Sequence, residues 1–148
     1  MKLSSPAFKD HGPIPAKYTC DGDDRSPELH IDDVPEGTES LVLIMEDPDV
    51  PTVIRSDRMW NHWVVWNIPA HTKKIPEGAK IGVEGENTWG RPGYGGPCPP
   101  AKHRYFFKLY ALDTKLHLQA GSTKSDLLAA TEGHVLDEAQ LMGTYERE

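Results

Sequence analysis

The chain has 148 residues, a length that suits one hydrophobic core, and we therefore predict a single domain over residues 1–148. With 37 % hydrophobic and 26 % charged residues, the composition is typical of a folded, soluble globular protein and excludes a disordered or fibrous chain. A formal net charge of −7 argues against nucleic-acid binding, which requires a basic surface. The apolar runs are also too short to cross a membrane.

Two features of the sequence bear on the compartment in which the protein resides. Residues 1–6 lack the apolar stretch of a signal peptide, and we expect a cytoplasmic protein. The two cysteines, Cys20 and Cys98, form one candidate pair but no disulfide framework. Reduced thiols are the expectation that fits a cytoplasmic protein.

The first half of the chain is predicted to form strands separated by loops rich in Gly, Pro and Asp. Weak strand signals lie at residues 2–4 and 28–31. Residues 40–45, Ser-Leu-Val-Leu-Ile-Met, form a continuous apolar run, which is typical of a buried strand. Residues 60–68 form a second long strand with three of the four tryptophans, and a brief strand is predicted at residues 80–83.

A loop with unusually many glycines and prolines, residues 90–100, leads into the strand on which we expect the site to be built, residues 103–111. Because side chains alternate along a strand, its polar pair, His103 and Tyr105, lies on the same face as an apolar row. That row is Phe107, Leu109 and Ala111. The face is therefore expected to pass from the core to a polar site at its loop end.

The last part of the chain carries the helix signal. Ser122 or Thr123 is a candidate N-cap for a helix over residues 124–132, and Gly133 would end it. Residues 137–146 alternate in polarity and are predicted to form a closing strand, with a helix as the alternative for their first half. These elements indicate a mainly β fold with short helices late in the chain.

Polar residues gather at the ends of three predicted strands: Asp47 and Asp49 after the apolar run, Trp60 and His62 at the start of the tryptophan strand, and His103 and Tyr105 at the start of the later one. If these ends meet, they form a pocket beside Gly95 and Gly96, whose backbone N–H groups can point at an anion. Carboxylates favour the charged form of nearby imidazoles, so we expect both histidines to be imidazolium ions. The set suits a phosphate, and especially a phospho-amine.

Plainer interpretations stand beside this one. Asp-Pro-Asp, residues 47–49, is most often a simple turn. Trp60, Trp63 and Trp66 are typical of core and rim packing, and a single strand histidine is usually structural. Cys98 is an inert thiol by default, although neighbouring imidazoles would lower the pKa of a thiol there. The convergence of three strand ends is what favours a binding site.

The sequence also resembles a known family. Asp47-Pro48-Asp49-Val50-Pro51, Trp60-Asn61-His62 and Gly96-Pro97 followed by His103-Arg104-Tyr105 are similar to the motifs of phosphatidylethanolamine-binding proteins. The segments at residues 87–91, 93–100 and 143–147 resemble the bacterial and archaeal branch, which is often labelled Raf-kinase-inhibitor-like. The resemblance extends from about Leu3 to Arg147.

The resemblance implies an antiparallel β-sandwich-like fold with a few peripheral helices and one small anion pocket. By motif match, the pocket would be lined by Asp47, Asp49, Trp60, His62, Gly96, His103 and Tyr105. Two departures from the family pattern matter. Pro100-Ala101-Lys102-His103 is one residue shorter than usual and lacks a glycine, which would alter the pocket rim. The chain also stops before the C-terminal helix of the animal members, so we expect no gating by that helix.

We therefore predict a non-enzymatic protein, without a cofactor, that binds phosphate, a phosphorylated small molecule or a phospholipid head group. The resemblance implies regulation or inhibition of a kinase or protease partner, and exposed loop aromatics would suit a homodimer. One alternative is a metal-dependent enzyme in which Asp47, Asp49, His62 and His103 hold zinc or iron. Another is a hydrolase that uses Cys98 and His103 as a dyad.

Overall fold

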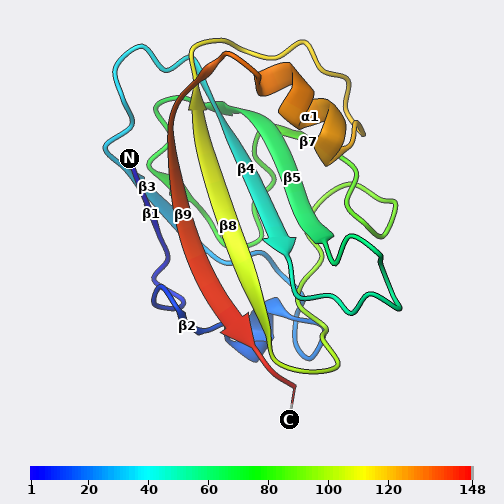
Figure 1. Cartoon of the computed structure of the whole chain (residues 1–148). Helices are drawn as coiled ribbons and strands as arrows, with labels where there is room; N and C mark the ends of the chain where they lie inside the picture. Colours follow the sequence, from blue (N-terminus) through cyan, green and yellow to red (C-terminus); the bar gives the residue numbers. More distant parts are fainter. Residues whose placement is uncertain (148) are drawn as a thin grey trace.

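The structure is a computed structural model that describes residues 1–147, and it is built mainly from β-strands (Figure 1). The elements in chain order are β1 (Lys2–Ser4), β2 (Gly12–Pro13), the 3₁₀ helix η1 (Ala16–Tyr18), β3 (Leu29–Asp32), β4 (Ser40–Asp47), β5 (Trp60–Pro69), β6 (Lys74–Ile75), β7 (Val83–Glu84), β8 (His103–Leu112), α1 (Lys124–Thr131) and β9 (Val135–Tyr145). No helix within this described part is long and apolar enough to cross a membrane.

The strands form two sheets, as the resemblance implied. The larger sheet has six strands in the order β2-β9-β8-β4-β5-β7, and the smaller has three in the order β1-β3-β6. The central pairs β9-β8, β8-β4 and β4-β5 are antiparallel, whereas the short β2-β9 pair is parallel. The expected mainly β, sandwich-like fold is confirmed.

The main core lies between the two sheets and follows the alternation of side chains. Phe107, Leu109 and Ala111 of β8 are fully buried on one face, beside Leu43 and Met45 of β4. The small sheet covers this face with Leu29, Ile31 and Ile75. The predicted apolar row of β8 is therefore confirmed as core.

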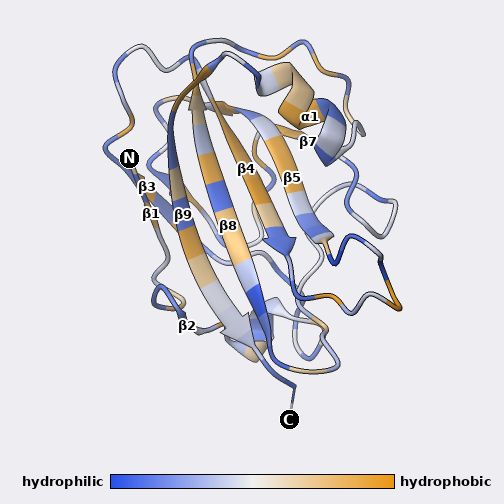
Figure 2. Cartoon of the chain, in the orientation of Figure 1, coloured by the Kyte–Doolittle hydropathy of each residue, from blue (hydrophilic) through white to orange (hydrophobic). Residues whose placement is uncertain are grey.

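The opposite face of the large sheet has a smaller apolar cluster beneath α1. It consists of Val42, Ile44, Val64, Trp66, Leu112, Leu116 and Leu127. Because both faces of β4 are covered, every residue of that strand is buried, which explains its continuous apolar sequence. Figure 2 shows β4 and β5 as hydrophobic along their middles and hydrophilic at their lower ends.

The predicted helix begins with a capping box. The Thr123 side chain accepts a hydrogen bond from the Asp126 backbone N–H, and the Asp126 carboxylate accepts one from the Thr123 N–H. Gly133, with φ of +80°, follows the helix. Of the two predicted caps, Thr123 is therefore the one used.

The main differences from the sequence prediction concern β9, β7 and the shortest strands. The closing strand β9 begins at Val135 and is a strand throughout, so the helical alternative for its first half is wrong. Only Val83 of the strand predicted at residues 80–83 is in β7, because Gly82 has a φ of +73° and interrupts the extended chain. The two-residue strands β2 and β6 have no strand pattern in their own sequence, because they form only by pairing with β9 and β3.

Candidate functional site

The end of β4 and the starts of β5 and β8 meet at one end of the large sheet, at the bottom of Figure 1. Asp47 of β4 pairs with Trp60 of β5, and Glu46 pairs with Phe106 of β8. This end opens into a cavity of about 220 Å³. Its lining consists of Asp47, Val50, Pro51, Ile54, Trp60, His62, Trp89, Cys98, Pro99, Pro100, His103 and Tyr105. The structure thus brings three predicted strand ends together.

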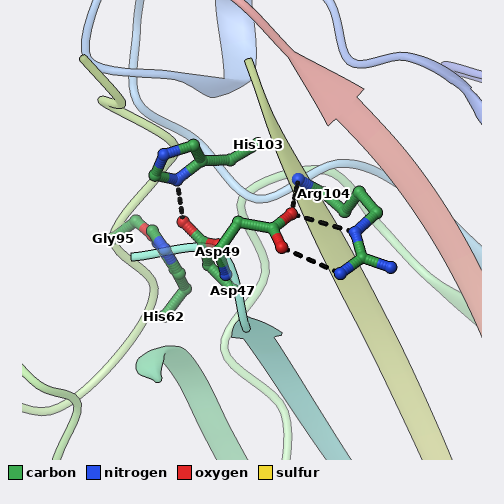
Figure 3. A network of polar contacts seen from close by, with 6 residues as sticks. All are labelled: Asp47, Asp49, His62, Gly95, His103 and Arg104. Atoms are coloured by element: carbon green, nitrogen blue, oxygen red, sulfur yellow. Dashed lines mark hydrogen bonds and ion pairs between the residues drawn. The ribbon is translucent and has the colours of Figure 1, made fainter. Parts of the chain in front are cut away.

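Asp47 and His103 form a buried pair at the base of this cavity (Figure 3). The Nδ1 atom of His103 lies 2.6 Å from Oδ2 of Asp47, and the backbone N–H of Asp49 donates to Oδ1 at 2.8 Å. Burial raises the pKa of the Asp47 carboxyl above its ordinary value, although the hydrogen bond from His103 acts in the opposite direction. Because Nδ1 is engaged, the cavity can use only Nε2 of His103.

His62 has a different partner from the one that the sequence predicted. Its Nδ1 atom lies 2.7 Å from the carbonyl oxygen of Gly95, and its ring packs edge-on against Trp89 and Tyr105. Burial lowers the pKa of His62 to about 4. The expectation that both histidines are imidazolium ions is therefore wrong for His62, because that ring is desolvated and has a neutral carbonyl as its partner.

Tyr105 also lines this cavity. Burial raises the pKa of Tyr105 well above its ordinary value, and the nearby Asp47 acts in the same direction. The hydroxyl therefore keeps its proton at any physiological pH. Tyr105 can donate a hydrogen bond to an oxygen atom of a ligand.

Asp49 lies outside the cavity lining, contrary to its predicted role. Figure 3 shows its carboxylate turned toward Arg104. The guanidinium donates to both carboxylate oxygens at 2.8 and 2.9 Å, and the Arg104 backbone N–H donates to Oδ2 at 2.9 Å. These bonds, the guanidinium first, lower the pKa of Asp49. Asp49 connects the end of β4 to the start of β8.

The two glycines do not present free N–H groups to the cavity either. The Gly95 N–H donates to the His62 carbonyl at 3.0 Å, and the Gly96 N–H donates to Asp24 at 2.7 Å. A side chain at Gly95 would collide with the Trp89 ring, and one at Gly96 would collide with the backbone of Tyr18. The glycines are needed for close packing. The prediction that their backbone N–H groups bind an anion is therefore wrong.

Cys98 is part of the cavity wall and forms a disulfide with Cys20. The two Cα atoms lie 5.4 Å apart, although 78 positions separate the residues in sequence. The expectation of reduced thiols is therefore wrong, and a Cys98–His103 nucleophilic dyad is excluded for this oxidised form. Reduced thiols were one reason to expect a cytoplasmic location. The disulfide removes that reason.

Sequence reasoning missed most of the apolar wall. Trp89 is 41 % exposed and packs edge-on against Trp60, with ring centroids 5.3 Å apart. Ile54, which is 55 % exposed, and the prolines Pro51, Pro99 and Pro100 complete the wall. Exposed apolar residues in irregular loops have no periodicity that could reveal them. The available signals were the density of prolines and glycines around Trp89 and the family motifs at residues 47–51, 87–91 and 93–100, none of which includes Ile54.

The sequence profile described as "Phosphatidylethanolamine-binding protein" matches residues 4–146. The chain belongs to the phosphatidylethanolamine-binding protein family. It is 52 % identical to a UPF0098 protein of Chlamydia pneumoniae over 149 residues, which cover 99 % of each chain. It is 48 % identical to a UPF0098 protein of Methanothermobacter thermautotrophicus over 155 residues, again with 99 % of each chain covered.

Solved structures of the phosphatidylethanolamine-binding protein family agree with this assignment. A putative homologue from Chlamydia trachomatis is 50 % identical, with a TM-score of 0.97, and the match covers 99 % of this chain and 97 % of that one. YbcL of E. coli, described as a member of the mammalian family, is 31 % identical, with a TM-score of 0.88 and coverage of 99 % and 98 %. The expected family, including its prokaryotic relatives, is confirmed.

Five of the eight residues predicted for the site line the cavity of this family member: Asp47, Trp60, His62, His103 and Tyr105. Pro99 and Pro100, at the start of the Pro100–His103 connection, lie in the wall itself. The cavity therefore combines a few polar groups at its base with an apolar rim. This combination is typical of a small-ligand site.

Proposed function

We propose that this protein is a non-enzymatic binding protein whose cavity holds the phosphate group of a small phosphorylated molecule. The observation that carries the proposal is the buried pair of His103 and Asp47, with Nδ1 of the imidazole 2.6 Å from the carboxylate. The carboxylate orients the ring and leaves Nε2 for a ligand. A protonated ring donates from Nε2 into the cavity, where an oxyanion accepts the bond.

Several further features support a phosphate ligand. The Tyr105 hydroxyl lines the cavity and provides a second donor. A volume of about 220 Å³ accommodates a phosphate with a short substituent. The apolar rim of Ile54, Trp89 and Pro100 would contact that substituent.

Calorimetric titration with phosphoethanolamine tests the proposal. We expect saturable binding by the wild-type protein and a loss of about tenfold or more in affinity for His103→Ala, because a hydrogen bond to a charged group contributes about 1.5–3 kcal/mol. Asp49→Ala is the matched control, since Asp49 lies beside the site but bonds to Arg104. Phosphoethanolamine should be recovered unchanged. Absence of binding, or equal affinity of His103→Ala and wild type, would contradict the proposal.

A further inference from the structure

We propose that the cavity recognises the protonated, singly charged form of a phosphomonoester or of free phosphate, and that it rejects sulfate and phosphodiesters. This inference rests on the proposed phosphate site and specifies its ligand. Its basis is that His62 presents a hydrogen-bond acceptor to the cavity, so the ligand must bring a donor. The donor is the P–OH group that only a protonated phosphate or phosphomonoester carries.

The position of the proton on His62 follows from its partner. A carbonyl oxygen can only accept a hydrogen bond, so the Nδ1 atom that lies 2.7 Å from Gly95 O carries the proton. Burial lowers the pKa of this ring to about 4, so it is neutral in mildly acidic and neutral solution. A neutral ring with a proton on Nδ1 has a lone pair on Nε2. Nε2 is therefore an acceptor.

The surroundings of His62 favour this neutral state. Its ring packs edge-on against Trp89 and Tyr105, with ring centroids 5.1 and 5.2 Å away. The charged or titratable groups nearest to it are His103 and Tyr105; His103 lowers the pKa of His62 further, and the Tyr105 hydroxyl stays protonated. Asp47, the nearby carboxylate, bonds to His103 and not to His62. The backbone hydrogen bonds to Gly95 and Gly96 raise the pKa of His62, but burial lowers it by more, so the ring stays neutral.

The Nε2 atoms of both histidines remain available to a ligand. Each ring uses Nδ1 for its hydrogen bond within the described chain, to Gly95 O for His62 and to Asp47 for His103. Some buried side-chain polar atoms in the described part of the protein lack a hydrogen-bond partner. Nε2 of His62 and Nε2 of His103 are not among them. Both residues line the cavity. A ligand there faces one obligatory acceptor, Nε2 of His62, beside His103 and Tyr105.

The charge of the cavity selects a singly charged ligand. No Lys or Arg is among the residues that line it, and Asp47 is its acidic residue. The lining therefore has no side chain with a fixed positive charge that could neutralise a dianion. A dianion would also place a negatively charged oxygen against the Nε2 lone pair of His62. Both effects favour the monoanion.

These requirements separate ligands that are otherwise alike. A phosphomonoester monoanion has one P–OH donor and acceptor oxygens on the same phosphorus atom. A phosphodiester, including the phosphate of an intact phospholipid, has the same single charge but no P–OH group. Sulfate has neither a donor nor a single charge near neutral pH. The cavity therefore distinguishes free head groups from the lipids that contain them.

Monomethyl phosphate, dimethyl phosphate and sulfate provide a direct test by calorimetry at pH 5.5. At this pH, monomethyl phosphate is mostly the monoanion, because its second pKa is about 6. We expect it to bind at least about tenfold more tightly than the other two, since an unpaired buried acceptor costs about 1–3 kcal/mol. Equal affinities would overturn the inference and leave the phosphate site intact. Absence of binding by all three would refute the proposed function itself.

Two further arms identify the group and the source of the ligand. His62→Asn retains an amide donor for Gly95 O but removes Nε2. The ratio of the affinities for monomethyl and dimethyl phosphate should therefore fall toward one. His30→Gln is the control. His30 lies on β3 and pairs with Glu28, so its replacement should leave this affinity ratio unchanged. Vesicles of phosphatidylethanolamine should not bind the protein in sedimentation. Binding to vesicles but not to monomethyl phosphate, or an undiminished preference in His62→Asn, would overturn the inference.

Discussion

His62 and His103 lie at neighbouring strand ends, but different partners give them different roles. His103 bonds to the Asp47 carboxylate, whereas His62 bonds to the neutral carbonyl of Gly95. The residue type alone predicts the same surroundings for both. The difference arises from one contact at each ring, an ionisable side chain for His103 and a backbone carbonyl for His62.

The buried, neutral His62 should make the protein less stable in mild acid. The pKa of its ring is 6.5 in the unfolded chain and about 4 in the folded protein. Between these values the unfolded state binds more protons, so the contribution of His62 is fully present above pH 6.5 and is lost as pH falls toward 4. The loss at pH 4.5 amounts to about 2–3 kcal/mol.

Urea denaturation of wild type and His62→Asn at pH 7 and pH 4.5 measures this effect. The variant has no imidazole at this position, so its free energy of unfolding should fall less between the two pH values. The other acidic and basic groups titrate in both proteins and cancel in the comparison. Equal losses in the two proteins would show that the His62 ring is not held neutral by the fold.

At the scale of a single element, β8 carries the transition from core to site. Its buried face begins with His103 and Tyr105 and continues with Phe107, Leu109 and Ala111. The outward-facing Arg104 fixes the start of the strand by its bonds to Asp49. One strand therefore supplies both the rigid support and two of the polar groups of the cavity.

Substitutions on β8 should separate stability from binding. Phe107 is fully buried, and Phe107→Ala should reduce the free energy of unfolding by about 3–5 kcal/mol, because it removes apolar contacts and leaves a cavity. His103→Ala at the loop end of the strand should cost much less stability while weakening phosphoethanolamine binding. Chemical denaturation and calorimetry of both variants provide the comparison. Similar destabilisation by the two substitutions would show that His103 serves the fold.

The loop at residues 94–100 depends on a contact with the N-terminal region. The Cys20–Cys98 disulfide, the bond from Cys20 N–H to Pro97 O and the bond from Tyr94 OH to Tyr18 O join the two segments. We expect reduction to lower the free energy of unfolding by about 2–4 kcal/mol, since the cross-link restricts the unfolded chain. Urea denaturation with and without dithiothreitol measures this, and a Cys20→Ala/Cys98→Ala variant should not respond to the reductant. A wild-type protein that is equally stable in both conditions would contradict the expectation.

At the scale of the whole molecule, the four candidate metal ligands do not converge. Asp49 is paired with Arg104, and His62 donates from Nδ1 to Gly95 O, so only Asp47 and His103 bond to each other. Within residues 1–147, no group of three or more His, Cys, Asp or Glu side chains is arranged to hold a metal ion. The geometry therefore gives no support to the predicted alternative in which these four side chains hold one metal ion.

Metal independence has a direct measurement. The midpoint of thermal unfolding and the affinity for phosphoethanolamine should be the same in EDTA and in added Zn²⁺, because neither solution changes a group that binds the ligand. A ligand that binds only the folded state raises the midpoint, so phosphoethanolamine serves as the positive control in the same assay. A rise with Zn²⁺, together with loss of phosphoethanolamine binding in EDTA, would support the metal-dependent alternative.

Local sequence determined the elements and the end of the sheet at which the cavity lies. The apolar run of β4 and the alternation in β8 predicted buried strands, and the polar residues at their ends predicted a site there. These signals are local because burial on one face repeats every second residue along a strand. The family motifs, which extend over nearly the whole chain, added the sandwich architecture.

Tertiary structure decided what each group in the cavity does. Asp49 is bound by Arg104, 55 positions later; Gly96 donates to Asp24, 72 positions earlier; and Cys98 pairs with Cys20, 78 positions earlier. His62 bonds to Gly95, which is 33 positions away, and burial in the fold keeps its ring neutral. Hydrogen bonding and desolvation depend on the few atoms in direct contact with a group. Those atoms come from distant segments that only the folded chain brings together.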